Sequence, residues 1–159
     1  MKSLTIMCSL DVSTTSTGFA IFHNGIYESS CLLDHSDNKD TNSRIAEMGN
    51  DILSALNKYN PVIVSIEDTY CGNNADTMKK LCRLQGIVYG WCLSHNADFN
   101  IYLPSSWRKE FGDLFKGKKR PECKRLAIEY VKDKYNIDVN DDEAEAILIG
   151  ESTVKKYKR

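Results

Sequence analysis

The chain has 159 residues, of which 42% are hydrophobic and 27% are charged. This length and composition predict a single globular domain over residues 1–159, with enough apolar side chains for a core, and exclude a disordered tail or a fibrous protein. The 21 basic and 22 acidic residues give a net charge of -1, which by itself neither indicates nor excludes a nucleic-acid partner.

The charges are unevenly distributed along the chain. Residues 106–134 hold ten Lys and Arg residues but five acids, and four of the five residues in 155–159 are also basic. The rest of the chain is correspondingly acidic. This separation predicts one surface that binds an anion and another place where carboxylates gather.

The first part of the chain is strand-like. Short apolar runs predict three consecutive antiparallel strands at 4–11, 16–23 and 26–33. Asn24-Gly25 separates the second from the third, and this dipeptide is the strongest local signal for a hairpin turn because both residues tolerate positive φ.

Helices and strands then alternate. Periodicity and composition predict a helix over 42–58, a strand covered on both faces at 62–67, a helix with an apolar stripe from Met78 to Trp91, and a short strand at 100–103. Leu84, Ile87 and Trp91 belong to that stripe. The pattern predicts an α/β domain with a mixed five-stranded sheet, three antiparallel strands followed by parallel ones, flanked by helices.

The last third is predicted to be helical. Pro104 begins a loop or a helical turn, and Pro121 fits the first turn of a helix that runs to about Tyr135. A final helix begins near Asp141, with Asn140 as its N-cap and Glu143 completing a capping box.

Cysteine usage and hydropathy bear on location. The six cysteines include no Cys-x-x-Cys pair, and we interpret them as reduced, buried residues of a cytosolic protein rather than a disulfide or zinc framework. The apolar run at residues 4–10 is too short to cross a membrane and lacks a cleavage site. We therefore expect a cytoplasmic protein with no targeting signal, no membrane partner and no small-molecule cofactor.

Four acids are candidates for a functional site, because helix capping and turn formation do not account for all of them. Asp11 ends the first strand, where an Asx-turn is an equally good explanation. Glu67 ends the buried strand, where an unpaired charge costs several kcal/mol or more and so requires a partner. Asp142 and Glu145 share one face of the last helix, because they are three residues apart.

These four carboxylates form an all-oxygen set without histidine or cysteine. Such a set suits Mg²⁺, for which Mn²⁺ often substitutes, and does not suit zinc. Two ions held by such acids activate a water and stabilise the leaving oxygen in phosphodiester hydrolysis. The residues therefore predict a metal-dependent nuclease with Asp11, Glu67, Asp142 and Glu145 as metal ligands and catalytic residues.

The motifs carry a family resemblance across nearly the whole chain. The segments that begin at Ser9 (SLDVSTTSTGFAI), Ile66 (IEDTY), Asn74 (NAD), Leu84 (LQGI), Leu103 (LPSSWRK) and Asp141 (DDEAEAI) resemble, in order, those of RuvC-type Holliday junction resolvases, closest to the shorter phage-encoded branch. The resemblance implies a ribonuclease H-like fold, a homodimer, and Mg²⁺-dependent paired nicking of a four-way DNA junction. Because the corresponding helix contributes to the dimer interface in the family, Leu84, Ile87 and Trp91 can be either core or subunit interface.

The same resemblance implies roles for individual residues. Asp11, Glu67 and Asp142 fall on three of the family's four acids, whereas Glu145 stands where the family usually has aspartate. Tyr70 occupies the place of an aromatic residue that stacks on unpaired bases, although an exposed loop tyrosine without a role is the alternative.

Basic residues supply the expected DNA surface. Arg108 and Lys119 fall where the family places cations near the scissile phosphate, and the 116–120 loop is better suited to phosphates than to a structural role. We also expect Lys109 and Lys124 in 106–134 to hold the DNA backbone, whereas Lys132 and Lys134 suit a solvated helix face. Besides Lys124, the predicted DNA-binding residues are Tyr70, Arg83, Arg108, Lys109, Lys116, Lys118, Lys119 and Arg120.

Three other functions stay open at this point. A ribonuclease H-like nuclease for structured RNA shares the first-strand motif, and a non-catalytic junction-binding protein shares the basic surface. A sugar-kinase or actin-like ATPase has a similar phosphate loop, but one domain lacks the second lobe that encloses ATP. Cleavage tests with DNA junctions and structured RNA, and an ATPase assay, separate these alternatives.

Overall fold

The computed structural model describes residues 6–69 and 72–159. Five strands in this part of the chain form one sheet in the order β3-β2-β1-β4-β5. β1, β2 and β3 are antiparallel neighbours, and β4 and β5 continue the sheet in parallel with β1. The strands are β1 (Ile6–Asp11), β2 (Ser16–His23), β3 (Ile26–Asp34), β4 (Ile63–Glu67) and β5 (Asp98–Tyr102).

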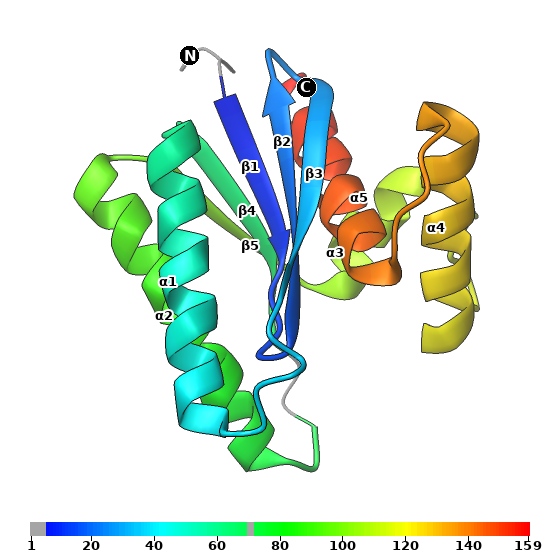
Figure 1. Ribbon diagram of the computed structural model, residues 1–159. Helices are drawn as coiled ribbons and strands as arrows, with labels where there is room; N and C mark the ends of the chain where they lie inside the picture. The colour runs from blue at the N-terminus through cyan, green and yellow to red at the C-terminus, as the bar shows by residue number, and fades with distance from the viewer. Residues whose placement is uncertain (1–5, 70–71) are drawn as a thin grey trace.

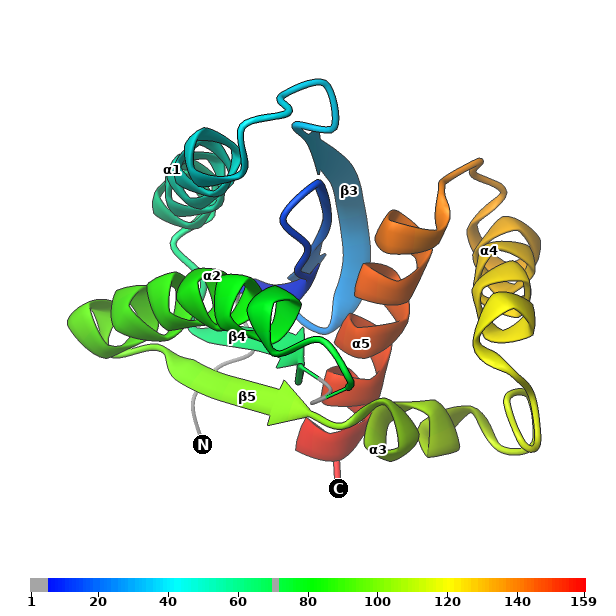
Figure 2. The same cartoon turned by 90° about the horizontal axis from the view of Figure 1, so that it is seen from below.

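Helices cover both faces of the sheet. α1 and α2 lie on one face, whereas α5 lies on the other with α4 packed outside it (Figures 1 and 2). α3 and the adjoining 3₁₀ turn η1 follow β5. The helical elements are α1 (Thr41–Tyr59), α2 (Ala75–His95), α3 (Pro104–Arg108), η1 (Lys109–Phe111), α4 (Arg120–Tyr135) and α5 (Asp141–Tyr157).

Each face of the sheet has its own core, because alternate strand residues point to opposite faces. Cys8, Leu10 and Ile66 pack toward α1 and α2, together with the fully buried Leu84. Met7, Phe22 and Ile63 pack toward α5 and α4. The stripe residues Leu84 and Trp91 are buried and the partly buried Ile87 packs beside them, so within the described chain this stripe is core.

The predicted α/β architecture is confirmed, with small differences at some boundaries. β5 begins at Asp98 rather than Asn100, because Asp98 donates its backbone N–H to the carbonyl of Val62 and pairs with Ile63. Pro104 begins the helical turn α3, and Pro121 lies in the first turn of α4 as predicted.

Two local predictions need correction. Asn140 caps α5 by accepting from the backbone of Glu143, but the carboxylate of Glu143 accepts from the Ser30 hydroxyl instead of closing a capping box. Cys31, on the edge strand β3, and Cys82 of α2 are exposed rather than buried. Among the described residues no helix is long and apolar enough to span a membrane.

Candidate active site

Asp11 and Glu67 lie at the ends of two neighbouring parallel strands. Leu10 of β1 pairs with Ile66 of β4, so each acid follows a paired position and points to the opposite face from these two core residues. That face is the one covered by α5. The parallel pairing therefore places the two carboxylates side by side at the same edge of the sheet.

The first turn of α5 lies directly against β2. Gly18 pairs with Asp11 in the sheet, and a Cβ atom on Gly18 would lie 2.0 Å from the carbonyl oxygen of Asp142. Any larger residue would push the two backbones apart, so glycine is required for this approach. Ser16 of β2 also donates its hydroxyl to the carboxylate of Asp142 at 2.5 Å.

All four predicted acids line one cavity of about 390 Å³. A second cavity of about 640 Å³ shares Asp11 and Glu67 with it and extends to the beginning of α2. The structure thus brings together carboxylates that are up to 134 positions apart in the chain. The acids that line the first cavity are Asp11, Glu67, Asp142 and Glu145, with Asp141 beside them.

Burial and mutual repulsion perturb these acids. Burial, and then the charges of Glu145, Glu67 and Asp142, raise the pKa of Asp11 well above its usual range. Burial also raises the pKa of Glu67, although the hydrogen bond from Trp107 acts in the opposite direction. Without a cation, Asp11 and Glu67 therefore do not readily ionise together.

Two neighbouring residues of α3 contact two different acids. The indole Nε1 of Trp107 donates to Oε2 of Glu67 at 2.6 Å, and Nη2 of Arg108 lies 3.6 Å from Oε1 of Glu145. Trp107 is fully buried, whereas the side chain of Arg108 is 21% exposed. The sequence marks both residues within the LPSSWRK motif, but nothing in it assigns the tryptophan to Glu67.

The chemistry of the donor set fits a divalent cation. Carboxylate oxygens are the ligands that hard cations prefer, and a cation relieves the repulsion that raises the pKa of Asp11. As the side chains lie, however, no three His, Cys, Asp or Glu residues within 6–69 and 72–159 have their donor atoms arranged to hold a metal ion. Metal binding at these acids therefore requires some side chains to turn away from their present partners.

Five of the predicted DNA-binding residues line one or both of two neighbouring cavities. Arg108 and Arg120 line the cavity of the acids. Lys109, Lys116 and Lys118 line a neighbouring cavity of about 620 Å³, to which Arg108 also contributes.

The remaining predicted residues lie elsewhere. Lys119 is exposed at the start of α4, and Arg83 is exposed on α2; neither lines one of these cavities. Tyr70 lies outside the described residues. Lys124 pairs with Asp141, and this hydrogen bond and its charge raise the pKa of Lys124.

Lys132 and Lys134 lie on a solvated helix face, as predicted, and each also has an ion-pair partner. Lys132 contacts Asp138 at 2.9 Å. Lys134 contacts the buried Glu151, also at 2.9 Å, and Glu151 accepts a further hydrogen bond from Tyr130. Lys134 therefore has a structural role, because it neutralises a carboxylate in the core.

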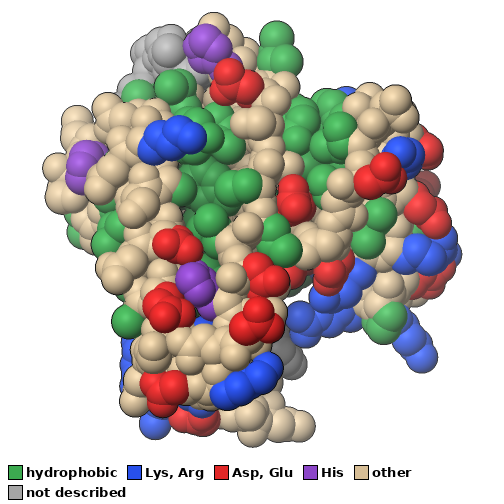
Figure 3. Space-filling view, viewed as in Figure 1, with side chains coloured by type: hydrophobic (Ala, Val, Ile, Leu, Met, Phe, Trp, Pro, Cys, Tyr) green, Lys and Arg blue, Asp and Glu red, His purple; other side chains and the backbone are tan. Residues whose placement is uncertain are grey.

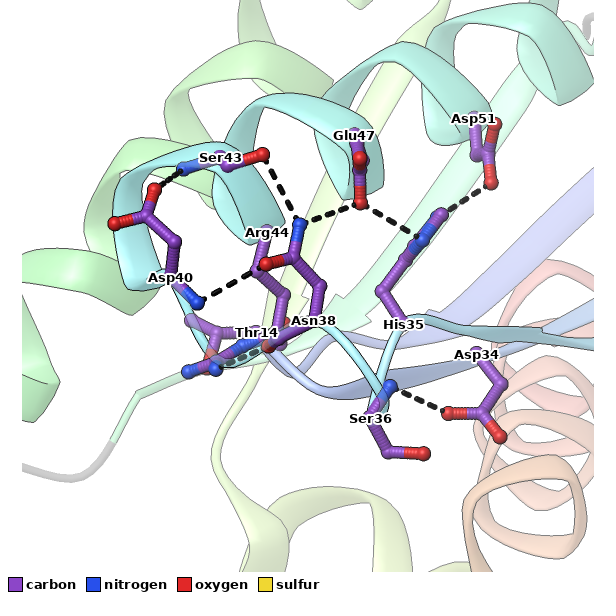
Figure 4. A network of polar contacts seen from close by, with 10 residues as sticks. All are labelled: Thr14, Asp34, His35, Ser36, Asn38, Asp40, Ser43, Arg44, Glu47 and Asp51. Atoms are coloured by element: carbon purple, nitrogen blue, oxygen red, sulfur yellow. Dashed lines mark hydrogen bonds and ion pairs between the residues drawn. The ribbon is translucent and has the colours of Figure 1, made fainter.

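The loop between β1 and β2, which lines the same cavity as the acids, is tied to α1. Arg44 donates from Nε to the carbonyl of Thr14 at 3.0 Å and from Nη1 to the carbonyl of Asn38 (Figure 4). His35 lies between Glu47 and Asp51 in the same network. These contacts join α1 to the polar segment before it, and the bond from Arg44 to Thr14 holds the loop that follows Asp11.

The charge separation seen in the sequence is only partly kept in space, because basic and acidic side chains are intermixed on α4. Acidic side chains gather over the end of β3 and the start of α1, on the face shown in Figure 3. The cavity that Lys109, Lys116 and Lys118 line is formed by residues of α3, η1 and the start of α4 with the segment between them. An anionic ligand is therefore favoured on the α3 and α4 side of the acids.

Comparisons with known proteins agree with this arrangement. Residues 7–146 match the family model for the crossover junction endodeoxyribonuclease RuvC. A crossover junction endodeoxyribonuclease RuvC from Rickettsia akari is 22% identical over 148 residues, which are 91% of this chain and 93% of that protein.

Solved structures share the fold at low sequence identity. Thermus thermophilus RuvC in complex with a Holliday junction substrate has a TM-score of 0.76 and 12% identity, with 97% of this chain and 96% of that one covered. The fowlpox virus resolvase in a complex with Holliday junction DNA has a TM-score of 0.65 and 17% identity, with 97% and 99% covered. These likenesses confirm the predicted type of sheet and its flanking helices.

Proposed function

The chain belongs to the family of the crossover junction endodeoxyribonuclease RuvC, and from this premise we propose that it cuts four-way DNA junctions by metal-dependent hydrolysis of phosphodiester bonds. In this proposal residues 1–159 act as one nuclease domain in the cytoplasm. The observation that carries the proposal is the set of four acids in one cavity bordered by basic residues.

We assign the metal to Asp11, Glu67, Asp142 and Glu145, with Mg²⁺ as the cation and two ions per site. All four side chains supply hard oxygen ligands, and burial together with the charges of the other three acids raises the pKa of Asp11, which a bound cation would counteract. When bound, the metal activates a water molecule and stabilises the charge on the leaving oxygen. Glu145 supplies a carboxylate with a longer reach than the aspartate that its relatives usually have.

The basic residues bind and orient the DNA. Arg108 and Arg120 are placed to contact the phosphate that is cut, because they line the cavity of the acids. The remaining basic side chains hold the flanking backbone and make binding sensitive to salt. These flanking residues are Arg83, Lys109, Lys116, Lys118 and Lys119, and Tyr70 stacks on an unpaired base at the crossover.

The cleavage assay uses a synthetic four-way junction with and without Mg²⁺. We expect paired, symmetric nicks with the metal and unchanged DNA without it. Glu67→Gln and Asp142→Asn should keep junction binding but abolish cleavage, because the basic surface remains while metal ligands are lost. Cleavage by either variant at the wild-type rate contradicts the metal-site assignment, and faster cutting of structured RNA than of junctions favours the RNA alternative.

We also propose a homodimer that forms through α2 and β5. Tyr89 and Leu93 of α2 are 48% and 66% exposed, and Ile101 of the edge strand β5 is 43% exposed. The ring of Tyr89 packs on Phe99 of β5, so these side chains belong to one surface. Exposed apolar patches of this kind mark interaction sites, and a symmetric pair supplies the two active sites that paired nicking needs.

The dimer is tested by light scattering on Leu93→Glu. We expect the variant to be monomeric, because two buried charges would face each other across the symmetric contact. Ile26→Glu is the matched control, since Ile26 is 71% exposed at the opposite edge of the sheet. A Leu93→Glu protein with the wild-type mass contradicts the assignment of this interface.

A further inference from the structure

Arg108 lies among the acids without a complete set of hydrogen bonds. Its contact with Glu145 is a single N···O distance of 3.6 Å, and among the described residues its Nε is buried without a hydrogen-bond partner. A well-fitted pair of arginine and carboxylate has two parallel bonds of about 2.7–2.9 Å. The contact with Glu145 is therefore an attraction between charges rather than a fitted pair, and it can be broken with little loss of hydrogen bonding.

The ring of Trp107 supports the guanidinium from one side. The guanidinium carbon of Arg108 lies 5.1 Å from the ring centre, which is within the range of a cation–π contact. Trp107 itself is fixed, because it is fully buried and donates to Glu67. Arg108 therefore has a rigid platform on which its guanidinium can move while it stays beside the acids.

Space for such a movement exists next to the present position. Arg108 lines the cavity of the acids and also the neighbouring cavity, where Lys109, Lys116 and Lys118 lie. A guanidinium displaced from Glu145 can therefore turn toward the side of the site where the three lysines lie. There its unpaired donors can be satisfied by an anion.

Glu145 is the point at which two cations compete. Its side chain is 8% exposed and forms an ion pair with Arg108, whereas Lys124, which also interacts with its charge, is paired with Asp141. A divalent ion carries twice the charge of a guanidinium and binds carboxylate oxygens directly. Occupation of this acid by Arg108 also agrees with the finding that the described side chains hold no arrangement ready for a metal.

We propose that Arg108 is a built-in counter-ion for Glu145 in the metal-free protein, which a divalent cation displaces toward the phosphate-binding side of the site. The inference deepens the proposed function, since it concerns the same metal site. It makes Arg108 a competitor of the metal before DNA binds, in addition to a ligand of phosphate afterwards.

The first test measures Mn²⁺ binding to the DNA-free protein by calorimetry. Arg108→Gln should bind Mn²⁺ about three- to thirtyfold more tightly than wild type, because the competing charge is gone. Lys109→Gln is the matched control, since it removes the adjacent positive charge without a contact to Glu145. Unchanged or weaker binding by Arg108→Gln overturns the proposal, as does an equal gain in Lys109→Gln, which would show a general effect of charge.

The second test uses the fluorescence of Trp107 and does not depend on affinity. The chain has two tryptophans, and Trp91 lies on the other face of the sheet, so Trp91→Phe leaves Trp107 as the reporter. Mn²⁺ quenches emission by itself, so Mg²⁺ is the probe here. We expect Mg²⁺ to change the emission of the Trp91→Phe protein, and to change it less when Arg108→Gln is added. Equal changes in the two proteins, or no change in either, overturn the displacement of Arg108 from the ring.

These results are separable from the proposed function. If wild type cuts four-way junctions with Mg²⁺ but Arg108→Gln does not bind Mn²⁺ more tightly, only the counter-ion role fails. If Arg108→Gln binds Mn²⁺ more tightly but wild type cuts no junction DNA, the proposed substrate fails and the counter-ion role stands.

Discussion

The hydrogen bond between Trp107 and Glu67 gives a quantitative prediction about stability. The bond is 2.6 Å long, its donor is fully buried, and its acceptor is a carboxylate. Hydrogen bonds to charged groups contribute about 1.5–3 kcal/mol to the free energy of unfolding. Trp107→Phe removes this bond and part of a buried ring, whereas in a Glu67→Leu background the same substitution removes the ring portion alone. The two costs should therefore differ by about 1.5–3 kcal/mol.

The measurement is a double-mutant cycle by urea unfolding of the metal-free protein, with EDTA at pH 8 and circular dichroism as the signal. Trp91 provides the control, because its indole donates to Asn57 at 2.7 Å on the other face of the sheet. A cycle between Trp91→Phe and Glu67→Leu should give a coupling near zero. A coupling below about 0.5 kcal/mol between Trp107 and Glu67 would refute the conclusion that the indole holds this carboxylate in place.

Three further predictions concern the other acids. Because the pKa of Asp11 is raised in the folded protein, its contribution to stability is present below the unfolded value of about 4 and is lost as the pH rises through the folded pKa. Thermal unfolding of the metal-free protein at increasing pH should show this loss of stability. Asp11→Asn should reduce the loss, and this variant should be more stable than wild type at pH 8. Gly18→Ala should lower the free energy of unfolding by about 1–3 kcal/mol and slow cleavage about a hundredfold, because its Cβ would displace Asp142. A variant with the wild-type free energy of unfolding and the wild-type cleavage rate would contradict the close approach of the two backbones. Ser16→Ala should raise the Mg²⁺ concentration for half-maximal cleavage about 10- to 100-fold, because Asp142 loses the hydroxyl that orients it. An unchanged Mg²⁺ dependence would show that the Ser16 hydroxyl does not orient Asp142 for metal binding.

Much of the fold follows from local pattern in this sequence. The Asn24-Gly25 turn, the apolar run of β4 and the Asn140 cap of α5 are each determined by neighbouring residues, so they could be predicted. The start of β5 could not, because Asp98 joins the sheet through a backbone bond to a distant strand. Glu143 likewise bonds to Ser30 of β3, a residue that no local rule connects to it.

The site shows the same limit. Asp11, Glu67, Asp142 and Glu145 were predictable because acids at strand ends or in excess of capping needs are unusual, and the structure brings them together. The partners that hold them come from tertiary packing. Trp107 is a core residue by composition, and its contact with Glu67 depends on how α3 turns back after β5.

The placement of the last helix has a consequence for synthesis of the protein. Asp142 and Glu145 belong to α5, and all residues of α5 from Ala144 to Val154 are buried. The candidate active site and the core on one face of the sheet therefore cannot form before α5 is present. A nascent chain that lacks α5 has neither a complete set of acids nor a covered sheet, so we expect activity to arise only after α5 has been synthesised and has docked. This order keeps an unfinished nuclease from cutting DNA, but it exposes one face of the sheet until the helix docks.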